Sequence, residues 1–160
     1  MKRVPIRFKL NGVERELEVQ PADTLLEMLR DGLGIKSPKT GCDHGDCGTC
    51  TVFLDGRTAR SCLVLAAEVD GCEIVTLEGI ARNPSPLMRE LARHNSFQCG
   101  FCAPGVVLSA TELLRSNPHP TRLEIQHAIA GNLCRCTGYT PILEGIEAAI
   151  EAAAAERSLP

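Results

Sequence analysis

Cysteine placement constrains this 160-residue chain more than any other feature, because eight of its nine cysteines form two sets of four. The first set, in GCDHGDCGTC and RSC, consists of Cys42, Cys47, Cys50 and Cys62. The second set, in QCGFC and LCRC, consists of Cys99, Cys102, Cys134 and Cys136. A fold of this chain must bring the thiols of each set together, so we expect two units that each enclose an inorganic group.

The first set has the spacing of a plant-type [2Fe–2S] cluster, C-x4-C-x2-C with a fourth cysteine further along the chain. Three glycines among these cysteines allow the backbone to approach a cluster closely: Gly41, Gly45 and Gly48. Zinc is less favoured, because the step from Cys42 to Cys47 is too long for a zinc knuckle and Cys62 lacks a near partner. His44 does not indicate a Rieske site, which needs a second histidine nearby.

The second set is less specific than the first. Cys99 and Cys102 form a C-x2-C pair before one predicted helix, and Cys134 and Cys136 form a C-x-C pair after another. On spacing alone these pairs fit zinc as well as iron. Cys102 lies near a predicted helix start, where we expect the helix dipole to stabilise its thiolate. Cys72, left over in DGCEI, is expected to be a half-buried residue at a strand edge.

The first half of the chain predicts a small sheet with one helix. Alternating apolar residues on both sides of Asn11-Gly12 predict a hairpin. Thr24 and Glu27 form a capping-box pattern that predicts the start of a helix. The segments CTVFLDGR and EIVTLEG predict further strands. We therefore expect a β-grasp, ferredoxin-like domain over residues 1–78.

The second half of the chain predicts helices. The segment ARNPSPL has two prolines and no strand pattern, and we place a linker there, at residues 79–86. Apolar residues at helical spacing then predict four helices, the first starting at Pro86 and the third at a capping box of Thr121 and Glu124. Short connections predict a four-helix bundle over residues 87–160. The expected fold class is α+β, with a β-grasp domain followed by this bundle.

Charge, hydropathy and missing motifs narrow the possible functions. A net charge of −3 without a polybasic stretch gives no reason to expect a nucleic acid partner. No apolar run reaches the length of a membrane span and no signal segment is recognisable, so we expect a cytoplasmic protein with reduced thiols. The chain has neither a G-x-G-x-x-G motif nor a P-loop, and no acid–base constellation is recognisable. Substrate chemistry is therefore expected in partner chains.

Taken together, the two cysteine sets resemble those of a known family. The motifs GCDHGDCGTCTV, SCL, QCGFCAPG and GNLCRCTGY match in order and spacing the iron–sulfur subunit of the molybdenum hydroxylases. This is the group of xanthine oxidase, aldehyde oxidoreductase and carbon monoxide dehydrogenase. Ala103 replaces the threonine usual in the family, a departure that touches no expected ligand.

The resemblance implies two [2Fe–2S] clusters in this chain. A distal, plant-type cluster would be held by Cys42, Cys47, Cys50 and Cys62, and a proximal cluster by Cys99, Cys102, Cys134 and Cys136. Gln98 and Cys136 would contact a molybdopterin, expected in its cytosine dinucleotide form, in a large subunit. The distal cluster would face FAD in a medium subunit, within a dimer of heterotrimers. Electrons would run from substrate through molybdenum, the proximal cluster and the distal cluster to the flavin.

Two alternatives stay open at this point. A free-standing, two-cluster ferredoxin-like carrier would also need both cysteine sets, although such carriers often use a stronger charge for steering. A structural zinc module would use the same thiols without sulfide. Iron and sulfide content separates the zinc module from the other two, and co-purification with a large subunit separates the carrier from the enzyme subunit.

Overall fold

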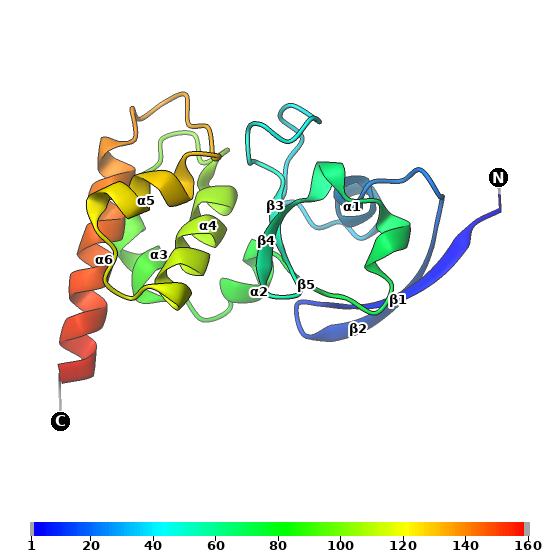
Figure 1. Ribbon diagram of the computed structural model, residues 1–160, viewed down its shortest axis with the longest axis horizontal. Helices are drawn as coiled ribbons and strands as arrows, with labels where there is room; N and C mark the ends of the chain where they lie inside the picture. Colours follow the sequence, from blue (N-terminus) through cyan, green and yellow to red (C-terminus); the bar gives the residue numbers. More distant parts are fainter. Residues whose placement is uncertain (1, 159–160) are drawn as a thin grey trace.

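A mixed sheet of five strands forms the first half of the protein and helices form the second (Figure 1). The computed structural model describes residues 2–158, with side chains described as far as residue 155. The strands are β1 (Val4–Leu10), β2 (Val13–Val19), β3 (Thr51–Leu54), β4 (Arg57–Arg60) and β5 (Glu73–Val75). Their order in the sheet is β2-β1-β5-β3-β4. Only β1 and β5 pair in parallel within this sheet; the other neighbours are antiparallel.

Two Xaa-Gly pairs make the tight turns of the hairpins. Asn11 and Gly12 have φ angles of 51° and 82°, and Asp55 and Gly56 have φ angles of 48° and 81°. Left-handed angles at both central residues define a type I′ turn, whose twist matches that of the flanking strands. The hairpin predicted at Asn11-Gly12 is therefore confirmed, with β1 and β2 on its two sides.

The sheet buries one face against a short helical segment. Ile6, Phe8 and Leu10 of β1 are buried while Arg7 and Lys9 between them are exposed. Helix α1 (Leu25–Glu27) starts at the predicted capping box and continues into a π-helical segment, η1 (Met28–Gly32). Two further turns of 3-10 helix follow β4, namely η2 (Ser61–Leu63) and η3 (Ala66–Val69). The apolar side chains of this half form one core.

The strand predicted in EIVTLEG is shorter than expected. Strand β5 ends at Val75, and Leu77–Ile80 form a short helix, α2. The backbone N–H of Thr76 donates to the Asn11 side-chain oxygen at 2.8 Å, so the chain leaves the strand ladder there. The side chain of Glu78 then accepts hydrogen bonds from Ser37 and Thr76. The prediction of a strand through this whole segment was therefore wrong, because side-chain contacts end it early.

All four predicted helices are present in the second half. They are α3 (Pro86–Arg93), α4 (Ala103–Ser116), α5 (Arg122–Ile129) and α6 (Thr140–Ser158). The side chain of Thr121 caps α5, as the capping-box pattern predicts, and the side chain of Ser85 caps α3. Helix α3 packs along α6 and α4 packs on α5, so that Val106, Ile125 and Ile146 are fully buried between helices. The division of the chain at residues 79–86 stays a prediction.

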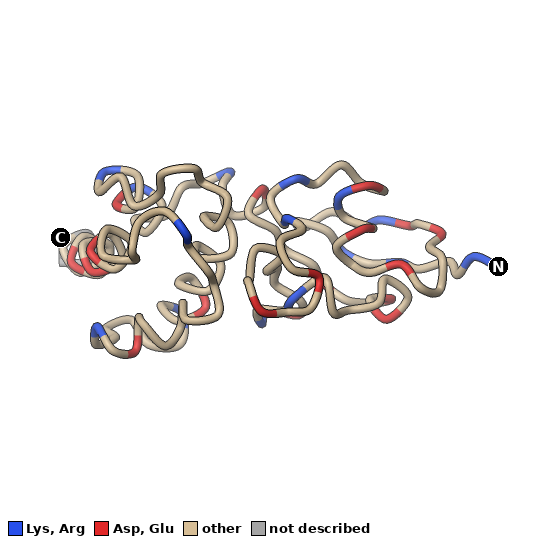
Figure 2. Tube along the Cα trace, turned by 90° about the horizontal axis from the view of Figure 1, so that it is seen from above, with Lys and Arg blue, Asp and Glu red and all other residues tan. Residues whose placement is uncertain are grey.

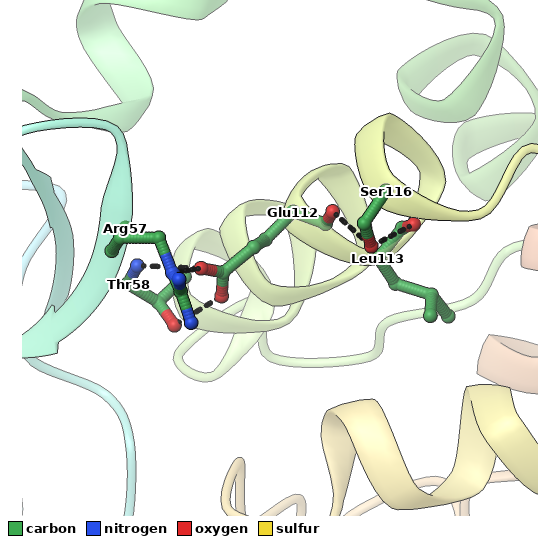
Figure 3. A network of polar contacts seen from close by, with 5 residues as sticks. All are labelled: Arg57, Thr58, Glu112, Leu113 and Ser116. Carbon is green, nitrogen blue, oxygen red and sulfur yellow. Dashed lines mark hydrogen bonds and ion pairs between the residues drawn. The ribbon is translucent and has the colours of Figure 1, made fainter.

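Helix α4 faces the sheet and joins the two halves (Figure 1). Its Glu112 carboxylate accepts hydrogen bonds from Arg57 and from the backbone and hydroxyl of Thr58, at the start of β4 (Figure 3). One turn further along α4, the Arg115 guanidinium lies 4.9 Å from the centre of the Phe53 ring in β3. These contacts tie the helices to the edge of the sheet that carries β3 and β4.

Charged residues of both signs are spread over both halves rather than gathered on one face (Figure 2). No helix within the described residues combines the length and the apolar character needed to cross a membrane.

Candidate metal centres

The first cysteine set lies on the long loop before β3 and in the turn after β4. The Sγ atoms of Cys50 and Cys62 are 3.4 Å apart, and the backbone N–H of Cys47 donates to Cys42 Sγ at 3.4 Å. A disulfide would bring two sulfurs to about 2.05 Å. Two thiolates on one tetrahedral metal ion, at about 2.3 Å each, lie roughly 3.7 Å apart. The close pair therefore has a separation near that of two ligands of one metal ion.

The loop around the first set disfavours a residue larger than glycine at two positions. A Cβ atom at Gly41 would lie 2.8 Å from Cys47 Sγ. At Gly45, where φ is +89°, a Cβ atom would lie 2.5 Å from a methyl carbon of Leu63. A larger residue would crowd the sulfur of Cys47 at Gly41 and strain the left-handed backbone at Gly45, so both glycines suit the close approach that the sequence predicts.

The thiols of the first set differ in acidity. Backbone N–H groups of Cys47 and His44 lower the pKa of Cys42 to about 6. Burial, together with the hydrogen bond to Cys50, raises the pKa of Cys62 to about 11. Cys42 is therefore a thiolate near neutral pH, whereas Cys62 must give up its proton when it binds a metal. His44 is largely exposed and contacts Asp46 at 3.2 Å, as expected of a solvated loop residue.

The second set is assembled from the segment before α4 and the segment after α5. The Sγ atoms of Cys99 and Cys136 are 3.5 Å apart at an exposed position. Cys134 Sγ lies 3.2 Å from the Thr137 hydroxyl, and Cys102 is buried next to Cys134. Burial and the hydrogen bond to Cys134 raise the pKa of Cys102 to about 12. Cys102 lies at the start of α4, as predicted, but burial opposes any stabilisation of its thiolate by the helix dipole.

The sulfurs of both sets are arranged in pairs. Among the described residues, no group of three His, Cys, Asp or Glu side chains surrounds a point that would hold one metal ion. A [2Fe–2S] cluster instead takes two thiolates at each of its two irons. The close pairs, Cys50 with Cys62 and Cys99 with Cys136, fit that requirement.

The segments that carry the two sets meet at one edge of the protein. In Figure 1 the loop before β3, in cyan, and the loop after α5, in orange, both lie at the upper edge. The backbone N–H of Leu133 donates to the carbonyl of Cys47 at 2.9 Å. This hydrogen bond joins a residue of the first set to the neighbour of Cys134 in the second set. The sequence gives no signal for this contact, because it depends on how the two halves dock.

Gln98 lies at the exposed end of the second set. Its side chain is exposed, as are Cys99 and Cys136. Two apolar side chains nearby in the sequence are also exposed, Phe101 by 44% and Leu133 by 55%. An exposed thiol pair with uncovered apolar neighbours is typical of a surface that another chain covers.

Cys72 is half-buried beside the core of the sheet, as its place in the sequence predicts.

The fold and the two sites define the class of protein. Residues 8–76 match the family model described as a 2Fe-2S iron-sulfur cluster binding domain, and residues 76–147 match the one described as a [2Fe-2S] binding domain. Each match contains one complete cysteine set. The chain is therefore a protein of two [2Fe–2S] binding domains, the first ferredoxin-like and the second helical.

Comparison with whole chains identifies the family. The small subunit of nicotine 6-hydroxylase from Paenarthrobacter nicotinovorans is 47% identical over 90% of this chain and 88% of its own length. The small FeS subunit of nicotinate dehydrogenase from Eubacterium barkeri is 42% identical over 94% of this chain and 98% of its own. The crystal structure of quinoline 2-oxidoreductase from Pseudomonas putida 86 superimposes with a TM-score of 0.91, at 40% identity and 99% coverage of both chains.

The chain belongs to the iron–sulfur small subunits of the molybdenum hydroxylases. It is the electron-transferring subunit of an oxidoreductase whose substrate chemistry lies in a partner chain. The family expected from the cysteine motifs is thus confirmed. A free-standing carrier is not favoured, because the similar proteins are parts of larger enzymes.

Proposed function

We propose that this chain conducts electrons between a molybdopterin in a large subunit and FAD in a medium subunit. The observation that carries this proposal is the placement of two cysteine sets, each with a close sulfur pair, on loops joined by the Leu133–Cys47 hydrogen bond. When bound, each [2Fe–2S] cluster takes up and releases one electron at a time. The chain's own task is to hold both clusters and to keep them apart from solvent and close to each other.

We assign the cluster ligands from the geometry of the thiols. Cys42, Cys47, Cys50 and Cys62 hold the distal cluster, and Cys99, Cys102, Cys134 and Cys136 hold the proximal cluster. The sulfur contacts favour Cys50 with Cys62 on one iron of the distal cluster and Cys99 with Cys136 on one iron of the proximal cluster. Gln98 and Cys136, both exposed, are the residues proposed to contact the molybdopterin.

The remaining features of the complex follow from the family. We propose a β-grasp for the first domain and a four-helix bundle for α3 to α6, with the domains divided at residues 79–86. We further propose the cytosine dinucleotide form of molybdopterin, a cytoplasmic location and a dimer of heterotrimers. The names of three similar proteins refer to nicotine, nicotinate and quinoline, so an aromatic N-heterocycle is the substrate class proposed for the complex.

Two substitutions in the purified complex test the proposed exit of electrons from the molybdenum site. Cys136→Ser removes a ligand of the proximal cluster and is expected to slow reduction of the flavin by substrate at least tenfold, the effect of about 1.4 kcal/mol on the barrier. Gln98→Ala is expected to leave both clusters assembled and to alter the spectrum of the molybdenum site. Unchanged flavin reduction in the Cys136→Ser complex would refute the assignment. Loss of iron–sulfur absorbance in Gln98→Ala would instead make Gln98 a structural residue.

A further inference from the structure

A single arginine side chain connects the loops that carry the two cysteine sets. Arg60 is the last residue of β4, two positions before Cys62. Its Nη1 donates to the Thr51 hydroxyl at 2.6 Å and its Nη2 donates to the carbonyl of Gly131 at 2.9 Å. Thr51 directly follows Cys50, and Gly131 begins the segment that leads to Cys134. The planar guanidinium thus binds one acceptor from each half of the protein.

The acceptors of Arg60 are themselves held in place. The Thr51 hydroxyl donates to the carbonyl of Gly48 at 2.6 Å. The side-chain amide of Asn132 donates to the same carbonyl at 3.2 Å, and its oxygen accepts from Ser109 of α4 at 2.8 Å. Asn132 is only 1% exposed. A buried network in which each donor has an acceptor resists displacement, because moving one member leaves other polar groups unpaired.

The backbones of the two halves also touch inside this network. A Cβ atom at Gly48 would lie 2.2 Å from the carbonyl oxygen of Gly131, and one at Gly105 would lie 2.3 Å from that of Gly48. No side chain larger than that of glycine fits at these two positions without movement of the backbone. The register between the two loops is therefore set at the residues next to the Cys47–Leu133 hydrogen bond.

The charge of Arg60 has no acidic partner among the described side chains. Arg60 is half-buried, and a cation in that position is normally balanced by an anion. Each [2Fe–2S] cluster with four thiolates is anionic, so the neighbouring clusters would supply the missing charge. This arrangement suits a side chain that is placed for the cluster-bound state.

We propose that Arg60 is a positioning residue for electron transfer between the two clusters. Its two hydrogen bonds keep the loops in the register in which the Cys47 carbonyl accepts from Leu133. The inference rests on the proposed function, because it needs both clusters. With both clusters bound, the step would transfer one electron from one cluster to the other, with no bond made and no proton transferred.

The test compares Arg60→Lys and Arg60→Gln with the wild type in the assembled complex. Arg60→Lys keeps the positive charge but cannot donate to Thr51 and Gly131 at the same time in the geometry of a guanidinium. Arg60→Gln loses the charge as well as this pair of hydrogen bonds. Thr51→Val removes one acceptor of Arg60 without changing a charge. Arg57→Gln serves as the matched control, because it removes another contact between the two halves, to Glu112, away from the cysteines.

Three quantities are measured in each variant: iron and sulfide content, the reduction potential of each cluster, and the magnetic interaction between the two reduced clusters in electron paramagnetic resonance. Arg60→Lys and Thr51→Val are expected to retain both clusters and both potentials but to change the magnetic interaction and slow electron exchange between the clusters severalfold. Arg60→Gln is expected in addition to shift both potentials downward. Arg57→Gln is expected to leave all three quantities unchanged.

Several outcomes would overturn the inference. If Arg60→Lys and Thr51→Val keep the wild-type magnetic interaction and exchange rate, Arg60 does not position the clusters. If both variants lose iron from either site, Arg60 acts in folding rather than in positioning. A wild-type complex without two clusters would refute the proposed function itself, which separates that failure from a failure of the role given to Arg60.

Discussion

Lys39 shows how one side chain of the sheet domain can act on the cysteines of the helical domain. Its backbone N–H donates to the carbonyl of Thr49 in the first cysteine loop at 2.9 Å, and its carbonyl accepts from the Thr49 hydroxyl at 2.9 Å. Its ammonium group lies 5.5 Å from the centre of the Phe101 ring, between Cys99 and Cys102 in the sequence. Burial and the charge of Arg30 lower the pKa of Lys39, and the charges of Glu78, Cys102 and Cys99 partly oppose that effect. Lys39 is therefore a cation held beside the second cysteine set.

Replacing Lys39 by glutamine is expected to lower the reduction potential of the proximal cluster and to leave the distal cluster unchanged. A nearby cation stabilises the reduced cluster, which carries one more negative charge than the oxidised one. Redox titration that resolves the two clusters checks this, with Lys39→Arg as the variant that keeps the charge. Lys36→Gln, on the exposed part of the same loop, is the matched control. Equal shifts of both clusters would contradict the prediction.

At the residue scale the sequence predicts ligands but not the residues that connect them. The spacing of Cys42, Cys47 and Cys50 carries enough information to indicate the cluster type, because the ligands are close in the chain. Arg60, Lys39 and Asn132 give no such signal. Each acts on atoms that lie far away in the sequence, and their roles appear only when the loops are brought together.

Helix α5 is an element whose first residue can be predicted from its neighbours in the sequence. Thr121 accepts from the backbone N–H of Glu124 at 3.3 Å, and Glu124 accepts from the backbone N–H of Thr121 at 2.6 Å. The helix spans only Arg122–Ile129, so its first turn is a large part of it. This capping box holds the helix in the position from which Asn132 and Cys134 follow.

Thr121→Ala is expected to lower the free energy of unfolding by about 1 kcal/mol, the usual cost of losing such a cap. Urea unfolding of the wild type and the variant measures the difference. Thr121→Ser keeps the hydroxyl and is expected to fall close to the wild type. An alanine variant as stable as the serine variant would show that packing alone sets the start of α5.

The sequence pattern does not predict the boundaries of helices and strands that depend on residues far away in the chain. The apolar alternation in EIVTLEG favours a strand throughout, but the strand ends where Asn11 binds Thr76 from another part of the chain. The π-helical segment after α1 is likewise not signalled by the capping box that starts the helix. The parallel pairing of β1 with β5 joins residues more than sixty positions apart, such as Lys9 and Glu73.

At the scale of the whole molecule, the docking of the two domains depends on α4 as well as on Arg60. Glu112 binds β4 through Arg57 and Thr58 (Figure 3). Burial opposes ionisation of this carboxyl, but the hydrogen bonds from Thr58 and Arg57 outweigh it and lower the pKa of Glu112. A lowered pKa means that the folded state favours the ionised carboxylate.

The contact of Glu112 is expected to weaken in acid. Its contribution is fully present above the ordinary pKa of 4.5 and is lost as the pH falls through the lower pKa of the folded state. Glu112→Gln is expected to cost ~1 kcal/mol at neutral pH, and the difference from the wild type should shrink toward pH 3. Unfolding free energies at several pH values check this, with Glu144→Gln on the exposed side of α6 as control. A difference that does not change with pH would contradict it.

The presence of two separate [2Fe–2S] clusters is tested by the metal and sulfide content of the purified chain, combined with electron paramagnetic resonance after reduction. We expect about four irons and about four sulfides per chain, and two distinguishable [2Fe–2S] signals. One signal should be lost in Cys62→Ser and the other in Cys102→Ser. Zinc without sulfide, or a single signal that both substitutions abolish together, would contradict the assignment of two separate clusters.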